Sequence, residues 1–369
     1  MKIIEVIAGF GAGGAEALLK DLSIGIKEEN HEVLVIIVDQ FSSDVSEISK
    51  INQLNQKGIR VISLNRKPQD KSFLLFFKIY KILKEYQPTV VHIHSFLAAV
   101  YFFPFAFVFK SKFVQTIHST QVAETKLQKI FYSILFPLKY RKVYCSETAY
   151  TSLKKIIGEG AVISNGIASY ISNDIREYIE KEFNIPKGSF IALNVGRIVD
   201  SKNQLLLLDL IEKLNNELYK GRLYLLLCGK HYEDDFYLKI ISKINQLKFK
   251  NNIKLIGVRD NITDLMYSSD LYISSSKYEG LPITVLEAMN TGVPLILSPI
   301  EEHLCVFKDL ESCYFPETNS VDSYVALFEN NQKIYAVDKE NIIIKRDSLI
   351  KRYNINTTVL NYLSFFKNN

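Results

Sequence analysis

The chain has 369 residues, 47% of them hydrophobic and 23% charged, which excludes a disordered chain and fits two domains or one large domain. A nucleic-acid binder would need a concentrated basic stripe, whereas the mild net charge of +5 suits an anionic membrane surface. The four cysteines lack CxxC spacing, so neither a zinc site nor a redox motif is indicated. Cys145 and Cys228 lie in or beside apolar runs, and we expect them to be reduced core residues of a cytoplasmic protein.

Strand-like and helix-like segments alternate from the N-terminus, which predicts a parallel sheet with helices on both faces. The first series of expected elements comprises the strands Lys2–Ala8, Glu32–Val38, Arg60–Leu64, Thr89–His94, Phe113–Ile117 and Lys142–Cys145, and the helices Ala15–Glu28 and Phe73–Tyr86. The apolar stretch Phe96–Phe109 contains Pro104 and is too short to span a bilayer, so we expect a buried helix there.

A second series of alternating segments begins near Phe190. It comprises the strands Phe190–Val195, Arg222–Cys228, Ile253–Ile256, Leu271–Ser274 and Pro294–Leu297, and the helices Asn203–Tyr219, Asp234–Leu247 and Thr284–Asn290. The turn sequences Asn165-Gly166 and Pro186-Lys187-Gly188 place the domain junction between the two series. We therefore predict an α/β fold of two Rossmann-like doubly wound domains, residues 1–165 and 166–351, facing each other across a cleft. The helical tail, residues 352–369, is expected to pack back on the N-terminal domain.

A glycine-rich loop, Gly9-Phe10-Gly11-Ala12-Gly13-Gly14, follows the first strand and enters a helix. Glycines allow close backbone approach to a ligand, and a helix N-terminus favours an anion. The spacing fits a dinucleotide fingerprint, and Asp39 lies near the limit of where its acidic residue should fall. The loop alone therefore does not separate a nicotinamide cofactor from a nucleotide sugar.

Two further motifs follow strands of the second series. Arg197 and Lys202, five positions apart, lie between a strand and a helix and form a candidate diphosphate clamp. Glu279 lies in a loop that continues through Gly280, Leu281 and Pro282, and Glu287 lies in the apolar helix that follows. A carboxylate in an apolar helix is costly unless it is paired or binds ligand hydroxyls, so the two acids suit a sugar and a ribose.

These motifs resemble the retaining glycosyltransferases with the two-domain GT-B fold known as family 4, or glycosyl transferases group 1. Glu279-x7-Glu287 matches the EX7E signature of that family, and Val195-Gly196-Arg197 with Lys202 matches its phosphate-binding segment. The likeness is most specific from residue 190 to residue 297. Asn203 stands where the family usually has glycine, and Pro299-Ile300-Glu301-Glu302 stands where it often has Gly-Gly.

The resemblance implies a role for each matching residue. Glu279, with Gly280, Leu281 and Pro282, would bind the donor sugar, and Glu287 the ribose. Arg197 and Lys202 would stabilise the departing diphosphate, and Gly13 and Gly14 would close over the phosphates. His118, which follows a strand of the N-terminal domain, would contact the reacting sugar. The expected donor is a nucleotide sugar, with a UDP-sugar favoured, and the expected acceptor is a sugar linked to a lipid diphosphate in capsule or O-antigen assembly.

No metal or cofactor is expected. His92 and His94 share one face of a strand with the spacing of metal ligands, but no third ligand is near in sequence. Asp234-Asp235 fits a helix cap better than a metal motif. The alternatives are a sugar-nucleotide epimerase on the same fold, a nicotinamide-dependent dehydrogenase, which explains only the glycine loop, and a non-enzymatic carbohydrate-binding protein.

The segment from Lys126 to Lys142 carries five cations, no acids and many apolar residues. The cations are Lys126, Lys129, Lys139, Arg141 and Lys142. Cationic ends around an apolar centre fit a helix that lies in a membrane interface. An ordinary core helix with solvated cations is the alternative. The sequence thus predicts a cytoplasmic enzyme docked on the inner face of the cytoplasmic membrane.

Overall fold

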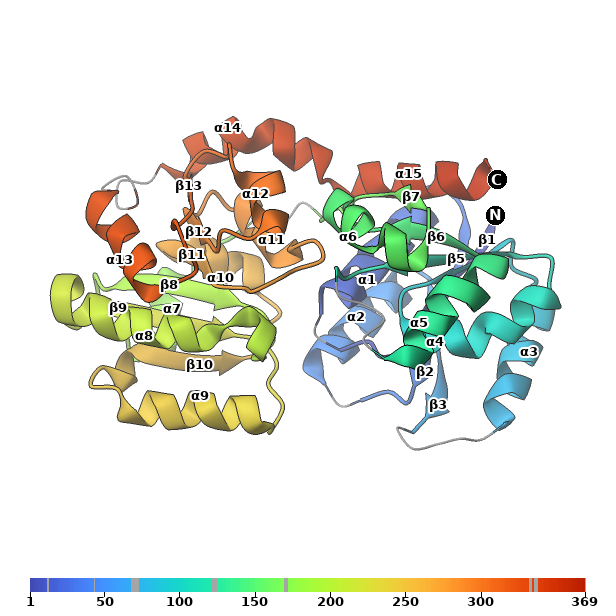
Figure 1. Ribbon diagram of the computed structural model, residues 1–369, viewed down its shortest axis with the longest axis horizontal. Helices are drawn as coiled ribbons and strands as arrows, with labels where there is room; N and C mark the ends of the chain where they lie inside the picture. Colours follow the sequence, from blue (N-terminus) through green and yellow to red (C-terminus); the bar gives the residue numbers. More distant parts are fainter. Residues whose placement is uncertain are drawn as a thin grey trace. The chain divides into compact units, whose positions relative to one another are not determined.

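The computed structural model describes residues 1–11, 13–42, 44–67, 73–120, 125–168, 172–331, 334 and 338–368. The chain divides into two compact units. The N-terminal unit comprises Met1–Ala168 together with Tyr353–Asn369, and the C-terminal unit comprises Ser169–Arg352. The division follows the Asn165-Gly166 turn, and the last segment of the chain belongs to the first unit (Figure 1).

The N-terminal unit contains a parallel sheet with the strand order β3-β2-β1-β4-β5-β6-β7. Its strands are β1 (Lys2–Ile7), β2 (Glu32–Asp39), β3 (Arg60–Arg66), β4 (Val90–Ile93), β5 (Lys112–Ile117), β6 (Tyr140–Tyr144) and β7 (Ala161–Val162). Its α-helices are α1 (Gly14–Glu28), α2 (Val45–Gln56), α3 (Leu74–Tyr86), α4 (Phe96–Phe102), α5 (Lys126–Ile130), α6 (Glu147–Ile157) and α15 (Ile355–Lys367). Strands covered by helices on both faces are buried throughout, which is why β1 and β2 are nearly continuous apolar runs.

The C-terminal unit has a second parallel sheet with the order β10-β9-β8-β11-β12-β13. Its strands are β8 (Phe190–Val195), β9 (Leu223–Cys228), β10 (Ile253–Gly257), β11 (Leu271–Ser274), β12 (Leu295–Leu297) and β13 (Cys313–Tyr314). Its α-helices are α7 (Arg176–Glu182), α8 (Gln204–Leu214), α9 (Asp235–Gln246), α10 (Ile262–Ser268), α11 (Ile283–Asn290), α12 (Glu301–Phe307), α13 (Val321–Asn330) and α14 (Lys339–Arg352). Asp234 caps α9 by accepting a hydrogen bond from the Tyr237 N–H, as its sequence position predicted.

Each sheet has one point at which the strand order reverses. In the N-terminal unit this point lies between β1 and β4, and in the C-terminal unit between β8 and β11. Connections leave the two central strands in opposite directions, so the loops at their carboxyl ends diverge and leave room for a ligand. The glycine loop follows β1, the Arg197–Lys202 segment follows β8, and Glu279 follows β11.

The C-terminal helix α15 completes the core of the N-terminal unit. Tyr362 and Phe366 are buried in the same cluster as residues of α1 and of the central strands. A Cβ atom at Gly25 of α1 would lie 2.5 Å from Val359 Cγ2, so the glycine permits the close approach of the two helices. The chain re-enters this unit at a parallel bridge between Ile167 and Asn354.

The stretch Phe96–Phe109 is not one helix. α4 ends at Phe102, and a 3-10 turn over Phe103–Phe107 follows. Pro104 has no N–H to donate, and its ring displaces the preceding turn, so an α-helix does not continue through it. Phe102 is buried, whereas Phe107 is 54% exposed, so only the first part of the stretch is the buried helix that was predicted.

Arg346 provides a test of what holds the C-terminal unit together. Its side chain is fully buried and donates hydrogen bonds to the backbone carbonyls of Met289, Val293, Glu311 and Ser312. An Arg346→Leu substitution removes the guanidinium donor from all four carbonyls. Within the described residues only Ser312 O keeps another donor, the Leu295 N–H, so the cost should be about 3 kcal/mol or more. We expect the midpoint of thermal unfolding of this unit to fall by about 6 °C or more.

The matched control is Lys345→Leu, one residue earlier on α14. Lys345 is half-exposed and forms a surface ion pair with Glu311, so its loss should cost less than about 1 kcal/mol. Calorimetry of the two variants beside the unchanged protein makes the comparison. Equal shifts for both variants would show that the four carbonyl contacts contribute nothing to stability.

Candidate functional site

The loop after β8 carries the first pair of predicted site residues. Arg197 is exposed, and among the described residues its side chain forms no hydrogen bond or ion pair. The backbone beneath it is tightly packed, because a Cβ atom at Gly229 would lie 2.0 Å from the Gly196 carbonyl oxygen. Gly229 also has a φ of 148°, which side chains rarely adopt, so glycine is required where the loops after β8 and β9 meet.

Asn203 explains one departure from the family pattern. Its φ of 54° and ψ of 39° place it in the left-handed region at the start of α8. Glycine is the usual residue for this conformation, and asparagine is among the few others that adopt it readily. Asparagine in place of glycine therefore preserves the left-handed backbone conformation between Lys202 and the first residue of α8.

Lys202 and Glu279 form the centre of the C-terminal site. The Lys202 Nζ atom forms an ion pair with Glu279 Oε1, although 77 residues separate the two side chains. Ser276 Oγ donates to the same carboxylate oxygen at 2.7 Å. Burial raises the pKa of Glu279, but the charge of Lys202 and the hydrogen bonds outweigh burial, so the net shift is downward and the group is ionised.

The loops after β8 and β11 are also joined by hydrogen bonds to backbone carbonyls. Ser275 Oγ donates to the carbonyls of Lys202 and Asn203, each at 3.0 Å, and the Lys277 N–H donates to Ser201 O at 2.8 Å. These contacts hold Lys202 and Glu279 at the point where the sheet order reverses. The position of this pair is thus set by hydrogen bonds to the main chain of the loop after β8, which a ligand need not disturb.

Two residues near Glu279 were not predicted from the sequence. His303 is fully buried, and its Nδ1 donates to Ser298 O at 2.9 Å, while Nε2 has no hydrogen-bond partner within the described residues. Glu302 Oε1 accepts from the Glu279 N–H at 3.4 Å. Both residues lie on α12: Glu302 is the last residue of the segment that replaces the usual glycines, and His303 directly follows it.

Glu287 lies on α11, half-buried, in the helix that the sequence predicted for it. Tyr272 of β11 lies near both glutamates, and its hydroxyl donates to Thr284 Oγ1 at 2.9 Å. Glu279, Glu287, Arg197 and Lys202 thus all belong to the C-terminal unit. Gly280, Leu281 and Pro282 connect Glu279 to the first residue of α11.

The N-terminal unit carries the remaining predicted residues. Gly13 is the N-cap of α1 and has an extended backbone, and Gly14 is the first residue of the helix. Ala12 lies outside the described residues. The first turn of a helix has N–H groups without intrahelical acceptors, so this loop presents donors suited to an anion.

His118 belongs to a hydrogen-bonded cluster with Glu5, His92 and His94. Glu5 Oε2 lies 2.9 Å from His92 Nδ1 and 2.7 Å from His94 Nε2, and His94 Nδ1 lies 3.0 Å from His118 Nε2. Glu5 and His92 are adjacent because β1 and β4 pair in register there. The Glu5, His92 and His94 ligand atoms lie within 4.8 Å of one another, close enough for a metal ion, but their mutual hydrogen bonds already account for that proximity.

The predicted interfacial helix from Lys126 to Lys142 is broken into shorter elements. α5 is followed by a π-helical turn over Phe131–Leu135, a 3-10 turn over Phe136–Leu138, and β6. Lys126, Lys129 and Lys139 are exposed. Large apolar side chains of the same segment are exposed beside them, namely Leu127, Ile130, Ile134 and Leu138. Among the described helices, none is both long and apolar enough to cross a bilayer.

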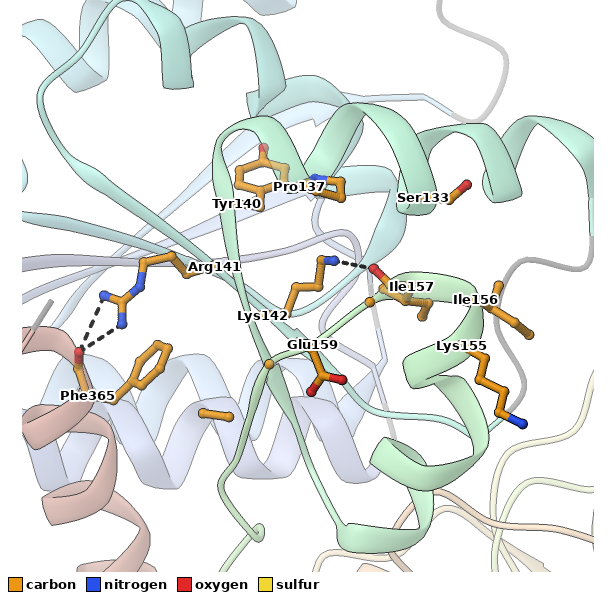
Figure 2. A pocket seen from close by; sticks show the side chains of 13 residues that line it. Ser133, Pro137, Tyr140, Arg141, Lys142, Lys155, Ile156, Ile157, Glu159 and Phe365 are labelled. Carbon is orange, nitrogen blue, oxygen red and sulfur yellow. Dashed lines mark hydrogen bonds between the residues drawn. The ribbon is translucent and has the colours of Figure 1, made fainter.

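The prediction is wrong for Lys142, which is buried on β6, whereas its neighbour Arg141 is half-buried; both contact carbonyls at helix C-termini (Figure 2). Lys142 is buried and donates to the carbonyl of Ile157, the last residue of α6. The Arg141 guanidinium lies 4.1 Å from the centre of the Phe365 ring and 3.5 Å from the Phe365 carbonyl in the last turn of α15. Cations near the C-terminus of a helix hydrogen-bond its last carbonyls favourably, so these contacts stabilise α6 and α15. Arg141 and Lys142 also line a cavity of 680 Å³.

Comparison with known proteins identifies the family. The glycosyl transferases group 1 model matches residues 175–351, and the Glycosyltransferase Family 4 model matches residues 12–169. The capsular polysaccharide biosynthesis glycosyltransferase CapH of Staphylococcus aureus is 30% identical over 253 residues, 65% of this chain and 68% of CapH. The UDP-Gal:alpha-D-GlcNAc-diphosphoundecaprenol alpha-1,3-galactosyltransferase of Escherichia coli is 25% identical over 311 residues, 77% of this chain and 76% of that enzyme.

A solved structure extends the likeness over the whole length. The crystal structure of Anabaena HepE in complex with UDP and glucose aligns with a TM-score of 0.85 at 18% identity, covering 100% of both chains. At that identity the likeness shows the fold, which is GT-B, with its two parallel sheets and alternating helices. The family models and CapH supply the rest: the chain belongs to the family 4, or group 1, glycosyltransferases and is an enzyme of that class.

Proposed function

We propose that this enzyme transfers a sugar from a nucleotide-sugar donor, with a UDP-sugar favoured, to a sugar acceptor with retention of anomeric configuration. The observation that carries the proposal is the meeting of Lys202, Glu279 and Ser276 at the reversal point of the second sheet, with exposed Arg197 earlier in the loop that carries Lys202. A cation for phosphate and a carboxylate for sugar hydroxyls are thereby held together. Retention follows from the likeness to the EX7E family.

The Lys202–Glu279 ion pair balances one positive and one negative charge within this site. A diphosphate would compete for the Lys202 ammonium, which has three N–H donors, and the carboxylate of Glu279 would then accept hydrogen bonds from sugar hydroxyls. Phosphate binding and sugar binding thus depend on the same ion pair. Loss of Lys202 would remove the cation that pairs with Glu279, and loss of Glu279 would remove the carboxylate that pairs with Lys202.

Arg197 and Lys202 also make a metal ion unnecessary in the proposed mechanism. Charge develops on the departing diphosphate, and preorganised cations stabilise it as a divalent metal does in other enzymes. We expect EDTA to leave the rate unchanged.

The direct experiment is a screen of UDP- and GDP-sugars for binding and slow hydrolysis, followed by transfer to sugar acceptors. Hydrolysis of at least one nucleotide sugar, with the anomeric product identified by NMR, is the expected result. Epimerised sugar nucleotide in place of released nucleoside diphosphate would favour the epimerase alternative.

The first functional prediction concerns the donor phosphates and sugar. Arg197→Ala and Glu279→Ala should each lower kcat by about a hundredfold or more, because each removes a group that acts on charge in the transition state. Thermal unfolding should stay close to that of the unchanged enzyme for Arg197→Ala, since this side chain is exposed. Lys213→Ala removes a cation of α8 that pairs with Asp322 and is the control. Near-normal turnover in either variant would remove that residue from the site.

The second functional prediction concerns Glu287. Ribose hydroxyls are bound equally in the ground state and in the transition state, so Glu287→Ala should raise the donor KM by about tenfold or more and change kcat little. Initial rates over a range of donor concentrations separate the two constants. A lower kcat with an unchanged KM would contradict the ribose role.

We further propose that the acceptor is linked to a lipid diphosphate in bacterial surface polysaccharide assembly, and that the N-terminal unit docks on the anionic inner face of the cytoplasmic membrane. The support is twofold. The name of the Escherichia coli relative includes a diphosphoundecaprenol-linked acceptor, and CapH is named for capsular polysaccharide biosynthesis. The docking surface is the exposed set Lys126, Leu127, Lys129, Ile130, Ile134, Leu138 and Lys139.

The test of docking is sedimentation with phosphatidylglycerol-containing against neutral vesicles. Replacing Lys126, Lys129 and Lys139 by Glu should weaken binding to the anionic vesicles by about a hundredfold or more, since each cation contributes about 1 kcal/mol. The control replaces Lys239, Lys250 and Lys308, exposed lysines of the C-terminal unit, by Glu for the same change in net charge. Equal weakening in both triple variants would mean that net charge, and not this surface, governs binding.

A further inference from the structure

A chain of hydrogen bonds runs from Glu5 through His94 to His118 in the N-terminal unit. Glu5 on β1 is fully buried, His94 directly after β4 is 4% exposed, and His118 directly follows β5. These hydrogen bonds therefore join three neighbouring strands of the sheet, from Glu5 within β1 to His94 and His118 just beyond the carboxyl ends of β4 and β5. The rings of His94 and His118 stack nearly parallel, with centroids 5.2 Å apart.

The position of each proton in this series of hydrogen bonds can be assigned by starting from Glu5 and proceeding toward His118. Burial raises the pKa of Glu5, but the His92 charge and the hydrogen bonds from both histidines outweigh burial and lower the pKa to about 2, so Glu5 is a carboxylate and only accepts. Burial lowers the pKa of His94 to about 4, so this ring is neutral. Its single proton must then lie on Nε2, which faces Glu5, and its Nδ1 is an acceptor.

The assignment passes on to His118. Its pKa is also lowered, chiefly by burial, so this ring is neutral and carries one proton. Because His94 Nδ1 accepts, His118 Nε2 must donate, and His118 Nδ1 is left with a lone pair. That Nδ1 atom is shielded from solvent and has no hydrogen-bond partner within the described residues.

We propose that Glu5 and His94 are positioning residues that hold His118 as its Nε2–H tautomer, so that Nδ1 accepts a hydrogen bond from a hydroxyl of the substrate sugar. The catalytic part of this inference rests on the proposed function of the enzyme, whereas the tautomer does not. A substrate hydroxyl would supply the donor that His118 Nδ1 lacks. An orienting carboxylate that fixes the tautomer of a histidine is a general device of active sites.

A second branch from Glu5 supplies a matched control. His92 Nε2 lies 2.8 Å from Thr116 Oγ1, which lies 2.8 Å from the Tyr362 hydroxyl, so this branch leads to α15 and away from His118. His92, like His94, is buried and bonded to Glu5. A substitution in this branch disturbs the same buried region without touching the partners of His118.

The decisive measurement is nitrogen-15 NMR of the six histidine rings in the full chain at neutral pH, with the His118 signals identified by their loss in His118→Gln. In the unchanged protein, His118 should show a protonated Nε2 and an unprotonated Nδ1. His94→Phe, which keeps the ring volume but removes the acceptor, should replace this pattern by an averaged one, and Thr116→Val should preserve it. A protonated Nδ1 or an imidazolium at His118 in the unchanged protein overturns the proposal, and that result needs no variant to fold.

Kinetics give the second measurement. On the nucleotide sugar that the screen identifies, His94→Phe should lower kcat at least about tenfold with the donor KM within about twofold, since a misplaced group acts on the transition state. Thr116→Val should change neither constant beyond about twofold. Equal decreases of kcat in both variants would mean that the hydrogen bonds from Glu5 through His94 to His118 have only a structural role. If no nucleotide sugar is turned over, the proposed function fails, and the NMR result still decides the tautomer.

Discussion

The reversal of strand order between two central strands is the constraint on which the polar chemistry of both units depends. β1, β4, β8 and β11 are covered on both faces, so a polar side chain within them is sealed in. Only beyond their carboxyl ends, where connections diverge, can a polar group be both positioned by the sheet and reached by a ligand. The glycine loop, the Lys202–Glu279 pair and His118 all occupy such ends.

The buried carboxylates of the two units, Glu5 and Glu279, have different kinds of partner. Glu5 is completely enclosed, and its charge is stabilised by two imidazoles that solvent does not reach. Glu279 is paired with Lys202, whose side chain keeps 21% of its surface exposed, as the proposed exchange of this partner for a ligand requires. The first arrangement fixes a geometry, whereas the second is an ion pair that substrate binding opens in the proposed function. A carboxylate whose partners cannot be replaced, such as Glu5, thus suits a positioning role. A carboxylate whose partner a ligand can replace, as proposed for Glu279, suits binding.

The sequence predicted those parts of the molecule that depend on neighbouring residues or on a motif. Apolar runs located the central strands, and EX7E spacing located Glu279 and Glu287 on the expected loop and helix. It did not predict that Arg141 and Lys142 would cap helices, because the carbonyls concerned, at Phe365 and Ile157, are distant in sequence. Nor did it predict the partners of Glu279 or the involvement of Glu5, since only folding brings such residues together.

The position of α15 in the N-terminal unit separates the order of synthesis from the order of folding. Helix α15 packs against α1, so the core that the two helices share stays incomplete in a ribosome-bound nascent chain until Tyr362 and Phe366 have emerged. The intervening unit, Ser169–Arg352, is a continuous segment and can close its own core first. The N-terminal unit is therefore synthesised before the C-terminal unit but completed after it, and α1 is where a chaperone would be expected to bind during translation.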